Sequence, residues 1–333
     1  MTVAPDEGML PFLRAADLPD TTAQHPWLID RLWAAAGVGI VGGAPKCCKS
    51  WLALDMAVSV ASATPALGCF RVAQQGGVLC YLAEDAVAGV KARLGGLCRS
   101  RGIDLRALPL DVITAPSLRL DLPADQRRLD RTVRACAPRM LLLDPFVRLH
   151  RMDENHSGDV SALLGYLRQI QREHDVAVVV VHHARKNGSA AAAGQALRGS
   201  GDFHAWGDSN LYLRRTHDQL LLTIEHRAAP APDPVSLALV HDGQAMDAHL
   251  EVTNPAAQQA TKPLTNHDLD ADALRALQQA EAPLSRTALR ATLRVRNERL
   301  GDALARLQAA GHVARSGDTW AAIAPPVPIP ASP

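Results

Sequence analysis

A short segment at residues 43–50 holds the residue types that could bind a chain of phosphates. Its sequence, Gly-Ala-Pro-Lys-Cys-Cys-Lys-Ser, fits the pattern G-x-x-x-x-G-K-[ST] at every fixed position except Cys48. In such a loop, backbone N–H groups surround the β-phosphate, the lysine reaches the β- and γ-oxygens, and the serine hydroxyl ligates Mg²⁺. We therefore expect ATP and Mg²⁺ to bind here. The expected nucleotide-binding residues are Gly43, Ala44, Pro45, Lys46, Cys47, Cys48, Lys49, Ser50 and Trp51.

Cys48 stands where the pattern has its second glycine. A left-handed backbone at that position strains a residue other than glycine by about 1–2 kcal/mol, which a folded domain can absorb. The thiol is also small enough to leave the phosphate cradle open. The alternative is a degenerate loop that no longer binds nucleotide. We expect Cys48 to affect the rate of turnover more than the binding of ATP.

Three more groups suited to this chemistry follow apolar runs later in the chain. A carboxylate at Asp144 could complete the Mg²⁺ site together with Ser50. Glu84 could orient or deprotonate the water that attacks the γ-phosphate, whereas Asp85 beside it suits a helix N-cap. His182 could lie close enough to sense the γ-phosphate. The alternatives are an exposed strand-end acid for Asp144 and a structural role for His182.

The elements that must position these groups alternate between strands and helices. Continuous apolar runs occupy residues 38–41, 78–82, 140–143 and 176–181. Such runs are typical of strands that are buried on both faces of a parallel sheet. Helical patterns lie between them, at residues 49–62, 86–101, 126–137 and 158–174. This order predicts an α/β fold with a mainly parallel, twisted sheet flanked by helices.

The pattern changes after residue 181. Residues 185–194 are small or polar and suit a mobile loop. Two strand candidates at residues 219–225 and 235–240 predict an antiparallel extension of the sheet. The expected division of the chain is an extension at 1–25, an α/β domain at 26–250, a linker at 251–267, a small domain at 268–323 and a Pro-rich tail at 324–333.

The small domain has the pattern of a winged helix-turn-helix. Helices are expected at residues 271–280, 285–293 and 297–310, with Ser285 as an N-cap, and two short strands follow around Gly317. Seven arginines between residues 286 and 315 make this segment locally basic.

The start of its last expected helix carries the candidate DNA-binding residues Arg296, Asn297 and Arg299. Recognition helices meet base edges through such positions. Winged helices also dock proteins, so either duplex DNA or a protein partner fits this domain.

Composition sets limits on the class of protein. With 333 residues, 47% apolar, 21% charged and a net charge of +1, the chain is expected to form about two globular domains without a uniformly basic surface. Its six cysteines form no C-x-x-C pair, which indicates buried thiols in a reducing compartment. Without a signal peptide or a membrane-length apolar stretch, we expect a cytoplasmic protein with no membrane partner.

Taken in order, these motifs resemble one known family. They are the octet at 43–50, Tyr-Leu-Ala-Glu-Asp at 81–85, Leu-Asp-Pro-Phe-Val-Arg-Leu-His at 143–150, Asp-Glu-Asn-His-Ser-Gly at 153–158, Val-His-His at 181–183 and Leu-Arg-Gly-Ser-Gly at 197–201. Over roughly residues 26–245 the chain resembles the RecA-like P-loop ATPases of the plasmid RepA hexameric replicative helicase type.

That resemblance implies roles for single residues. Lys49 and Glu84 would act in ATP hydrolysis, and His182 would couple it to the loop that follows. In such homohexamers this loop faces a central channel and grips single-stranded DNA. The residues implied to contact the DNA phosphates are Arg185, Lys186 and Arg198.

An arginine finger from the neighbouring subunit would neutralise the charge of the transition state. Arg227 occupies the place where relatives carry theirs, and Arg214 and Arg215 compete with it.

Two other classes of function stay open. One is an ATP-switched DNA-binding regulator or a partition or replication accessory factor without unwinding activity, and the other is a P-loop kinase for a small molecule.

Overall fold

The computed structural model describes residues 12–17, 26–152, 157–183, 201–216, 219–241, 248–253, 266–280, 282–293 and 297–323. The chain divides into two compact units, Met1–Ala257 and Gln258–Pro333, and this boundary falls inside the predicted linker. Most of the predicted N-terminal extension and the whole Pro-rich tail lie outside the described residues. Within the described ranges, no helix combines the length and the apolar character that a membrane span requires.

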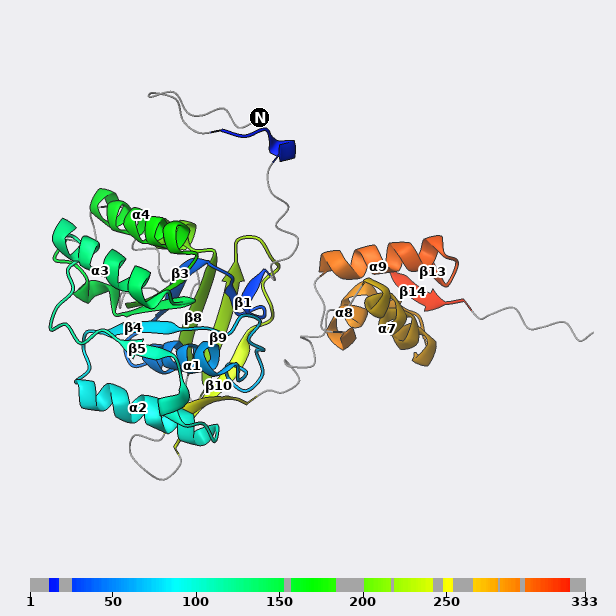
Figure 1. Cartoon of the computed structure of the whole chain (residues 1–333). Helices are drawn as coiled ribbons and strands as arrows, with labels where there is room; N and C mark the ends of the chain where they lie inside the picture. The colour runs from blue at the N-terminus through cyan, green and yellow to red at the C-terminus, as the bar shows by residue number, and fades with distance from the viewer. Residues whose placement is uncertain are drawn as a thin grey trace, which may run out of the picture. The chain divides into compact units, whose positions relative to one another are not determined.

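A nine-stranded sheet forms the centre of the first unit (Figure 1). Its strands are β3 Val38–Gly43, β4 Val78–Leu82, β5 Leu110–Val112, β6 Met140–Asp144, β7 Ala177–His183, β8 Ser209–Thr216, β9 Gln219–His226, β10 Val235–His241 and β11 Ala248–Val252. Their order across the sheet is β11-β10-β9-β8-β3-β7-β6-β4-β5. The strands from β8 to β5 pair in parallel, and those from β8 to β11 pair antiparallel. The predicted mainly parallel sheet with an antiparallel extension is confirmed.

Helices cover both faces of this sheet. Figure 1 shows α1 and α2 on one face and α3 and α4 on the other. The helices of the unit are α1 Lys49–Ser62, α2 Val87–Ser100, α3 Pro123–Cys136, α4 Ser157–His174 and α5 Gly201–Trp206, with short 3-10 turns η1 Ala15–Asp17, η2 Leu105–Ala107 and η3 Phe146–Arg148. A hairpin of β1 Trp27–Ile29 and β2 Trp33–Ala34 precedes the sheet. The layers are those of a doubly wound α/β domain.

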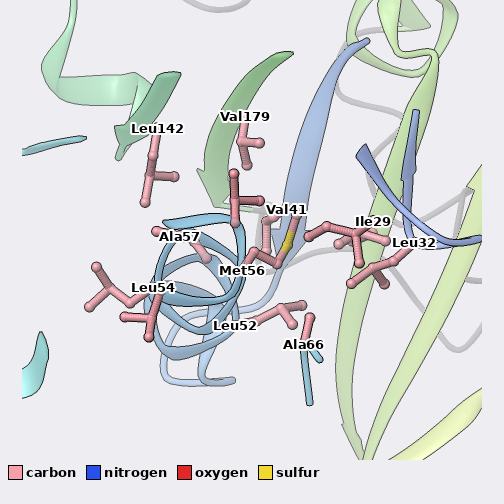
Figure 2. Packing of buried hydrophobic residues seen from close by; sticks show 14 of the residues in the cluster. Ile29, Leu32, Val41, Leu52, Leu54, Met56, Ala57, Ala66, Leu142 and Val179 are labelled. Atoms are coloured by element: carbon pink, nitrogen blue, oxygen red, sulfur yellow. The ribbon is translucent and has the colours of Figure 1, made fainter. Parts of the chain in front are cut away.

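Helix α1 is the most deeply buried of these helices because it packs against the centre of the sheet. Figure 2 shows its Leu52, Leu54, Met56 and Ala57 among side chains from three strands, which are Val41, Leu142 and Val179. All of these side chains are fully buried. Close packing of this kind fixes the first turn of α1, and with it the preceding loop, relative to the strand ends.

Strand β8 was not predicted, although it lies directly beside β3. Its first residues, Ser209 and Asn210, are polar and yet buried. They satisfy backbone groups of neighbouring segments: the Ala34 N–H donates to Ser209 Oγ over 3.0 Å, and the Ile40 N–H donates to Asn210 Oδ1 over 3.2 Å. The polar residues at the start of β8 do not look like a buried strand in the sequence. Their burial depends on hydrogen-bond partners about 170 residues away.

Several element boundaries also differ from the predictions. The short strands β5 and β11 were not foreseen, and β11 takes the first two residues of the predicted linker. Helix α3 begins at Pro123, three residues before the predicted start, because proline is well suited to the first turn of a helix.

The second unit contains three helices and a three-stranded sheet. Its elements are α7 Asn266–Gln279, β12 Leu284–Ser285, α8 Arg286–Leu293, α9 Asn297–Ala309, β13 Val313–Ser316 and β14 Thr319–Ala322. The strand order is β12-β14-β13, and the core includes Leu289, Leu304 and Trp320. The Ala288 N–H donates to Ser285 Oγ over 3.2 Å, as expected for the predicted N-cap. The three predicted helices and the hairpin are present, although α7 begins at Asn266, five residues before its predicted start, and β12 was not predicted. Their assignment as a winged helix-turn-helix stays a prediction.

Candidate nucleotide-binding site

The phosphate loop, His182, Asp144 and Glu84 lie at the carboxyl edge of the parallel strands. The loop that leads into α1 follows the central strand β3, whose Gly42 is in register with His182 of β7. Asp144 ends β6 and is in register with Leu82 of β4, two residues before Glu84. The order β3-β7-β6-β4 therefore sets the phosphate loop, the histidine, the aspartate and the glutamate along one edge. Open α/β sheets bind their ligands at this edge.

Residues 43–50 form a tight loop with an unusual backbone. Cys48 adopts a left-handed conformation, with φ 64° and ψ 22°, and Lys46 has a φ of 63°. Gly43 also has a positive φ of 152°, and a Cβ placed there would lie 2.3 Å from the Leu213 carbonyl oxygen of β8. Glycine is required at position 43 because β8 leaves no room for a side chain. At position 48, in contrast, the strain that the sequence analysis considered is present.

Lys49 is folded over this loop. It is only 4% exposed, and its Nζ donates a hydrogen bond to the Ala44 carbonyl oxygen over 2.8 Å and contacts Cys47 Sγ at 3.9 Å. Burial lowers the pKa of the Lys49 ammonium, although the neighbouring Cys47 and Asp144 oppose the change. An ammonium that is buried against a loop of backbone N–H groups is well placed for an anion, since a bound phosphate would restore the solvation that it lacks.

Asp144 is 5% exposed and lies close enough to Ser50 for that hydroxyl to oppose the rise of its pKa. Burial raises the pKa of Asp144 to about 6, and the negative charges of Asp85 and Glu84 add to the rise, while Ser50 and Lys49 oppose it. A carboxylate and a hydroxyl are oxygen ligands of the kind that Mg²⁺ prefers. The pair therefore fits the predicted metal site, and a divalent cation would stabilise the ionised form of Asp144.

The raised pKa predicts a pH-dependent stability for the nucleotide-free protein. A folded-state pKa of about 6, above the ordinary 3.8, stabilises the protein fully below pH 3.8, and this contribution is lost as the pH rises through 6. We expect Asp144→Asn, which cannot ionise, to gain stability over the wild type between pH 4 and pH 7, by about 1–3 kcal/mol. Denaturant unfolding of both proteins across this range measures the difference. Parallel pH profiles would contradict the prediction.

The two acids after β4 both form ion pairs. Arg148 Nε of η3 donates to Glu84 Oε1 over 2.9 Å, and their side chains are 61% and 46% exposed. Arg93 of α2 pairs with Asp85 at 2.6 Å, and its guanidinium lies 5.6 Å from the ring centre of Trp51. The prediction that Asp85 caps α2 is wrong, because the N-cap residue is Ala86 and its side chain makes no capping bond. Glu84 is left as the more accessible acid at the site.

His182 lies in an aromatic cluster. Its ring is 4.2 Å from that of Phe203 in α5 and 5.9 Å from that of Phe146 in η3, with Phe146 and Phe203 in edge contact at 4.8 Å. Both phenylalanines are buried. The cluster joins the end of β7 to the segment after Asp144 and to the helix that begins at Gly201. His182, the predicted sensor, therefore contacts both η3 and α5.

Arg227, the predicted arginine finger, is bound within its own chain. Its guanidinium donates to the carbonyl oxygens of Ala205 and Trp206 and lies 3.3 Å from an Asp208 carboxylate oxygen. Asp208 in turn donates its N–H to the carbonyl of Val38, at the start of β3. The six residues of β3 span about 20 Å, and the phosphate loop follows the other end of this strand. Arg227 therefore cannot reach the phosphate loop of its own chain. Its role toward a neighbouring subunit stays a prediction.

The predicted DNA contacts lie largely beyond the part of the chain that the structure describes. Arg185, Lys186, Arg198 and Arg296 fall outside it, as does the whole of the predicted mobile loop at 185–194. Asn297 and Arg299 lie in the first turn of α9. These six assignments stay predictions.

The six cysteines are all free, and the prediction that they are buried holds only for Cys47, Cys80 and Cys98. Cys136 is exposed at the end of α3, and Cys48 and Cys69 are partly exposed. Arg148 had no predicted role, although this residue closely follows Asp144 in the sequence. The signal that could have identified Arg148 is a basic residue that closely follows an acid at the end of a strand.

A protein-family model, AAA_25, described as an AAA domain, matches residues 4–189. The chain belongs to this family. Among solved structures, one described as an ATPase domain is 16% identical, with a TM-score of 0.50 over 65% of this chain and 84% of that one. At this identity the likeness shows the fold alone. The predicted RecA-like P-loop ATPase fold is confirmed, and membership of the RepA branch stays a prediction.

Two further solved structures are similar at lower TM-scores. "The Structure Of A DnaB-Like Replicative Helicase And Its Interactions With Primase" is 16% identical, with a TM-score of 0.49 over 62% of this chain and 56% of that one. "Crystal structure of the RadB recombinase" is 17% identical, with a TM-score of 0.45 over 66% of this chain and 92% of that one.

The left-handed backbone of Cys48 predicts measurable effects on the stability and turnover of this AAA_25 protein. We expect Cys48→Gly to stabilise the fold by about 1–2 kcal/mol, because glycine adopts the left-handed backbone without strain. ATP affinity should stay within about threefold, while the rate of turnover changes. Cys48→Ala is the matched control, since it removes the sulfur and keeps the strain. Isothermal titration and phosphate release measure the two quantities, and a large gain in affinity for Cys48→Gly would show that the cysteine impairs binding itself.

Proposed function

We propose that the chain is a Mg²⁺-dependent ATPase whose turnover is coupled to DNA, of the plasmid RepA replicative helicase type. The observation that supports it most is the meeting of Lys49, Ser50 and Asp144 around one phosphate-type loop. Lys49 would bind the phosphates, and Ser50 with Asp144 would hold Mg²⁺, which when bound screens the negative charge of the phosphates. The remaining nucleotide contacts would come from residues 43–51.

Glu84 is the proposed general base. It lies at the carboxyl edge, near enough to Asp144 to raise the pKa of that carboxyl, and its side chain is half exposed, which gives water access. The ion pair with Arg148 would have to loosen before Glu84 could take a proton, because the guanidinium occupies the Oε1 atom of that carboxylate. Arg148 is thus placed to restrain hydrolysis until the site is complete.

Coupling to DNA would pass through the end of β7. His182 packs on Phe203, and Phe203 lies in α5, directly after the segment that carries the proposed DNA contacts. A movement of His182 toward a bound γ-phosphate would therefore be transmitted to that segment through close-packed rings. Single-stranded DNA would bind there in the channel of a homohexamer, and Arg227 would serve the neighbouring subunit.

The second unit would recruit duplex DNA or a replication protein. Its arginines outnumber its acids between residues 286 and 315, and Arg296, Asn297 and Arg299 would contact the DNA. Binding to duplex DNA should weaken steeply with salt, because each phosphate contact releases counterions. A salt-independent interaction with a protein would support the other kind of partner.

The test is ATP hydrolysis with and without single-stranded DNA, followed by strand displacement on a forked duplex. Faster hydrolysis with DNA and displacement of the strand are the expected results. DNA-dependent hydrolysis without displacement would favour an ATP-switched regulator, whose slow turnover would fit the Glu84–Arg148 pair and the strained Cys48. Hydrolysis that ignores DNA would contradict the coupling.

A further inference from the structure

Arg215 lies beside the phosphate loop of its own chain. It is the seventh residue of β8, its side chain is exposed, and its Nη2 is 3.6 Å from Cys48 Sγ. Cys48 is the last residue before α1, so this sulfur stands at the positive end of that helix. The guanidinium therefore borders the place where the loop would hold a phosphate.

The register of the sheet explains why Arg215 reaches this place. Leu213 of β8 pairs with Gly43, the first residue of the loop, so β8 continues beyond that glycine toward the loop. Successive side chains of a strand point to opposite faces. Leu213 belongs to the core on the α1 side of the sheet, and Arg215 shares its face, whereas Tyr212 and Arg214 share the other.

The charge of Arg215 is not balanced within the described residues, where no carboxylate forms an ion pair with it. Two other arginines near the edge differ, since Arg148 pairs with Glu84 and Arg93 pairs with Asp85. Lys49 lies on the same loop and is buried. Two cations thus converge on one loop, as a ligand with several negative charges requires.

We propose that Arg215 binds the β- and γ-phosphates of the nucleotide that its own subunit holds. This inference rests on the proposed function and makes Arg215 a phosphate-binding residue within one subunit, in contrast to a finger that acts across an interface. The planar guanidinium can hold two phosphate oxygens at once, which a lysine cannot. Arg215 would add to the affinity for ATP and ADP and not to that for AMP.

A binding measurement tests this directly. Each protein is titrated with ATP, ADP and AMP in Mg²⁺ at a temperature where hydrolysis is negligible, and folding is checked by circular dichroism. Arg215→Ala should lose about 10- to 100-fold in ATP affinity, and Arg215→Lys should lose less. Arg172→Ala is the control, because it removes an equal charge from an exposed position of α4, on the other face of the sheet.

Several outcomes would overturn the inference. They are an Arg215→Ala variant that binds ATP as the wild type does, an Arg172→Ala variant that loses as much affinity, and an equal loss of affinity for AMP. Wild-type protein that binds no ATP would instead overturn the proposed function itself. The two failures are therefore distinguishable.

A mixing experiment tests whether Arg215 acts within its own subunit. Arg215→Ala subunits keep an intact loop, and Lys49→Ala subunits keep an intact Arg215. If Arg215 served a neighbour, mixed assemblies would regain ATP binding at the Arg215→Ala loops. We expect no such recovery, and recovery in the mixture would assign Arg215 to the interface.

Discussion

Lys49→Ala should abolish ATP hydrolysis and weaken ATP binding by about 100-fold or more. The ammonium is buried against the loop, where it already donates to the Ala44 carbonyl. Removing a cation that contacts a transferred phosphoryl group typically costs two to three orders of magnitude in rate. Phosphate release and calorimetric titration with ATP measure the two effects.

The variant should fold at least as well as the wild type. Burial disfavours the charged form of Lys49, so its removal relieves a desolvation cost in the nucleotide-free protein. Lys91→Ala, which removes an exposed lysine from α2, serves as the control and should keep both binding and hydrolysis. A folded Lys49→Ala protein with near wild-type turnover would contradict the role of the loop.

Glu84→Gln should lower the rate of hydrolysis by about 10²–10⁴-fold and leave ATP binding nearly unchanged. A general base contributes about this much to the rate. The side chain is half exposed and its ion pair with Arg148 lies at the surface, so its loss should cost less than about 1 kcal/mol of stability. Single-turnover phosphate release separates this effect from binding.

Asp85→Asn is the matched control for Glu84→Gln. The two acids are adjacent, and Asp85 is committed to Arg93 of α2. Its loss should reduce the rate by less than about tenfold, through the position of α2 alone. An equal loss in both variants would assign the base to neither residue, and a large loss only in Asp85→Asn would reverse the assignment.

The sequence predicted the parallel core and the phosphate loop because both depend on local signals. Strands β4 and β6 are continuous apolar runs, and α1 has the bounds that its pattern indicated. The acid at the end of β6 also carries a local signal, since it closes such a run. The pattern of apolar residues within each segment is enough to indicate whether it forms a strand or a helix and which side chains it buries.

The residues that were missed depend on partners far away in the sequence. Asn210 lies in a central strand because its side chain accepts a hydrogen bond from Ile40. The contact between Arg215 and Cys48 joins positions 167 residues apart. No local pattern encodes such pairings, which arise only when the sheet brings its strand ends together.

The most direct measurement of the central claim is steady-state phosphate release by the folded wild-type protein, with ATP, in the presence of Mg²⁺ and in the presence of a chelator. We predict release that saturates with ATP, requires Mg²⁺ and disappears in both Lys49→Ala and Asp144→Asn. Release that persists in the chelator or in Lys49→Ala, or a folded wild-type protein that releases no phosphate with or without DNA, would contradict the account.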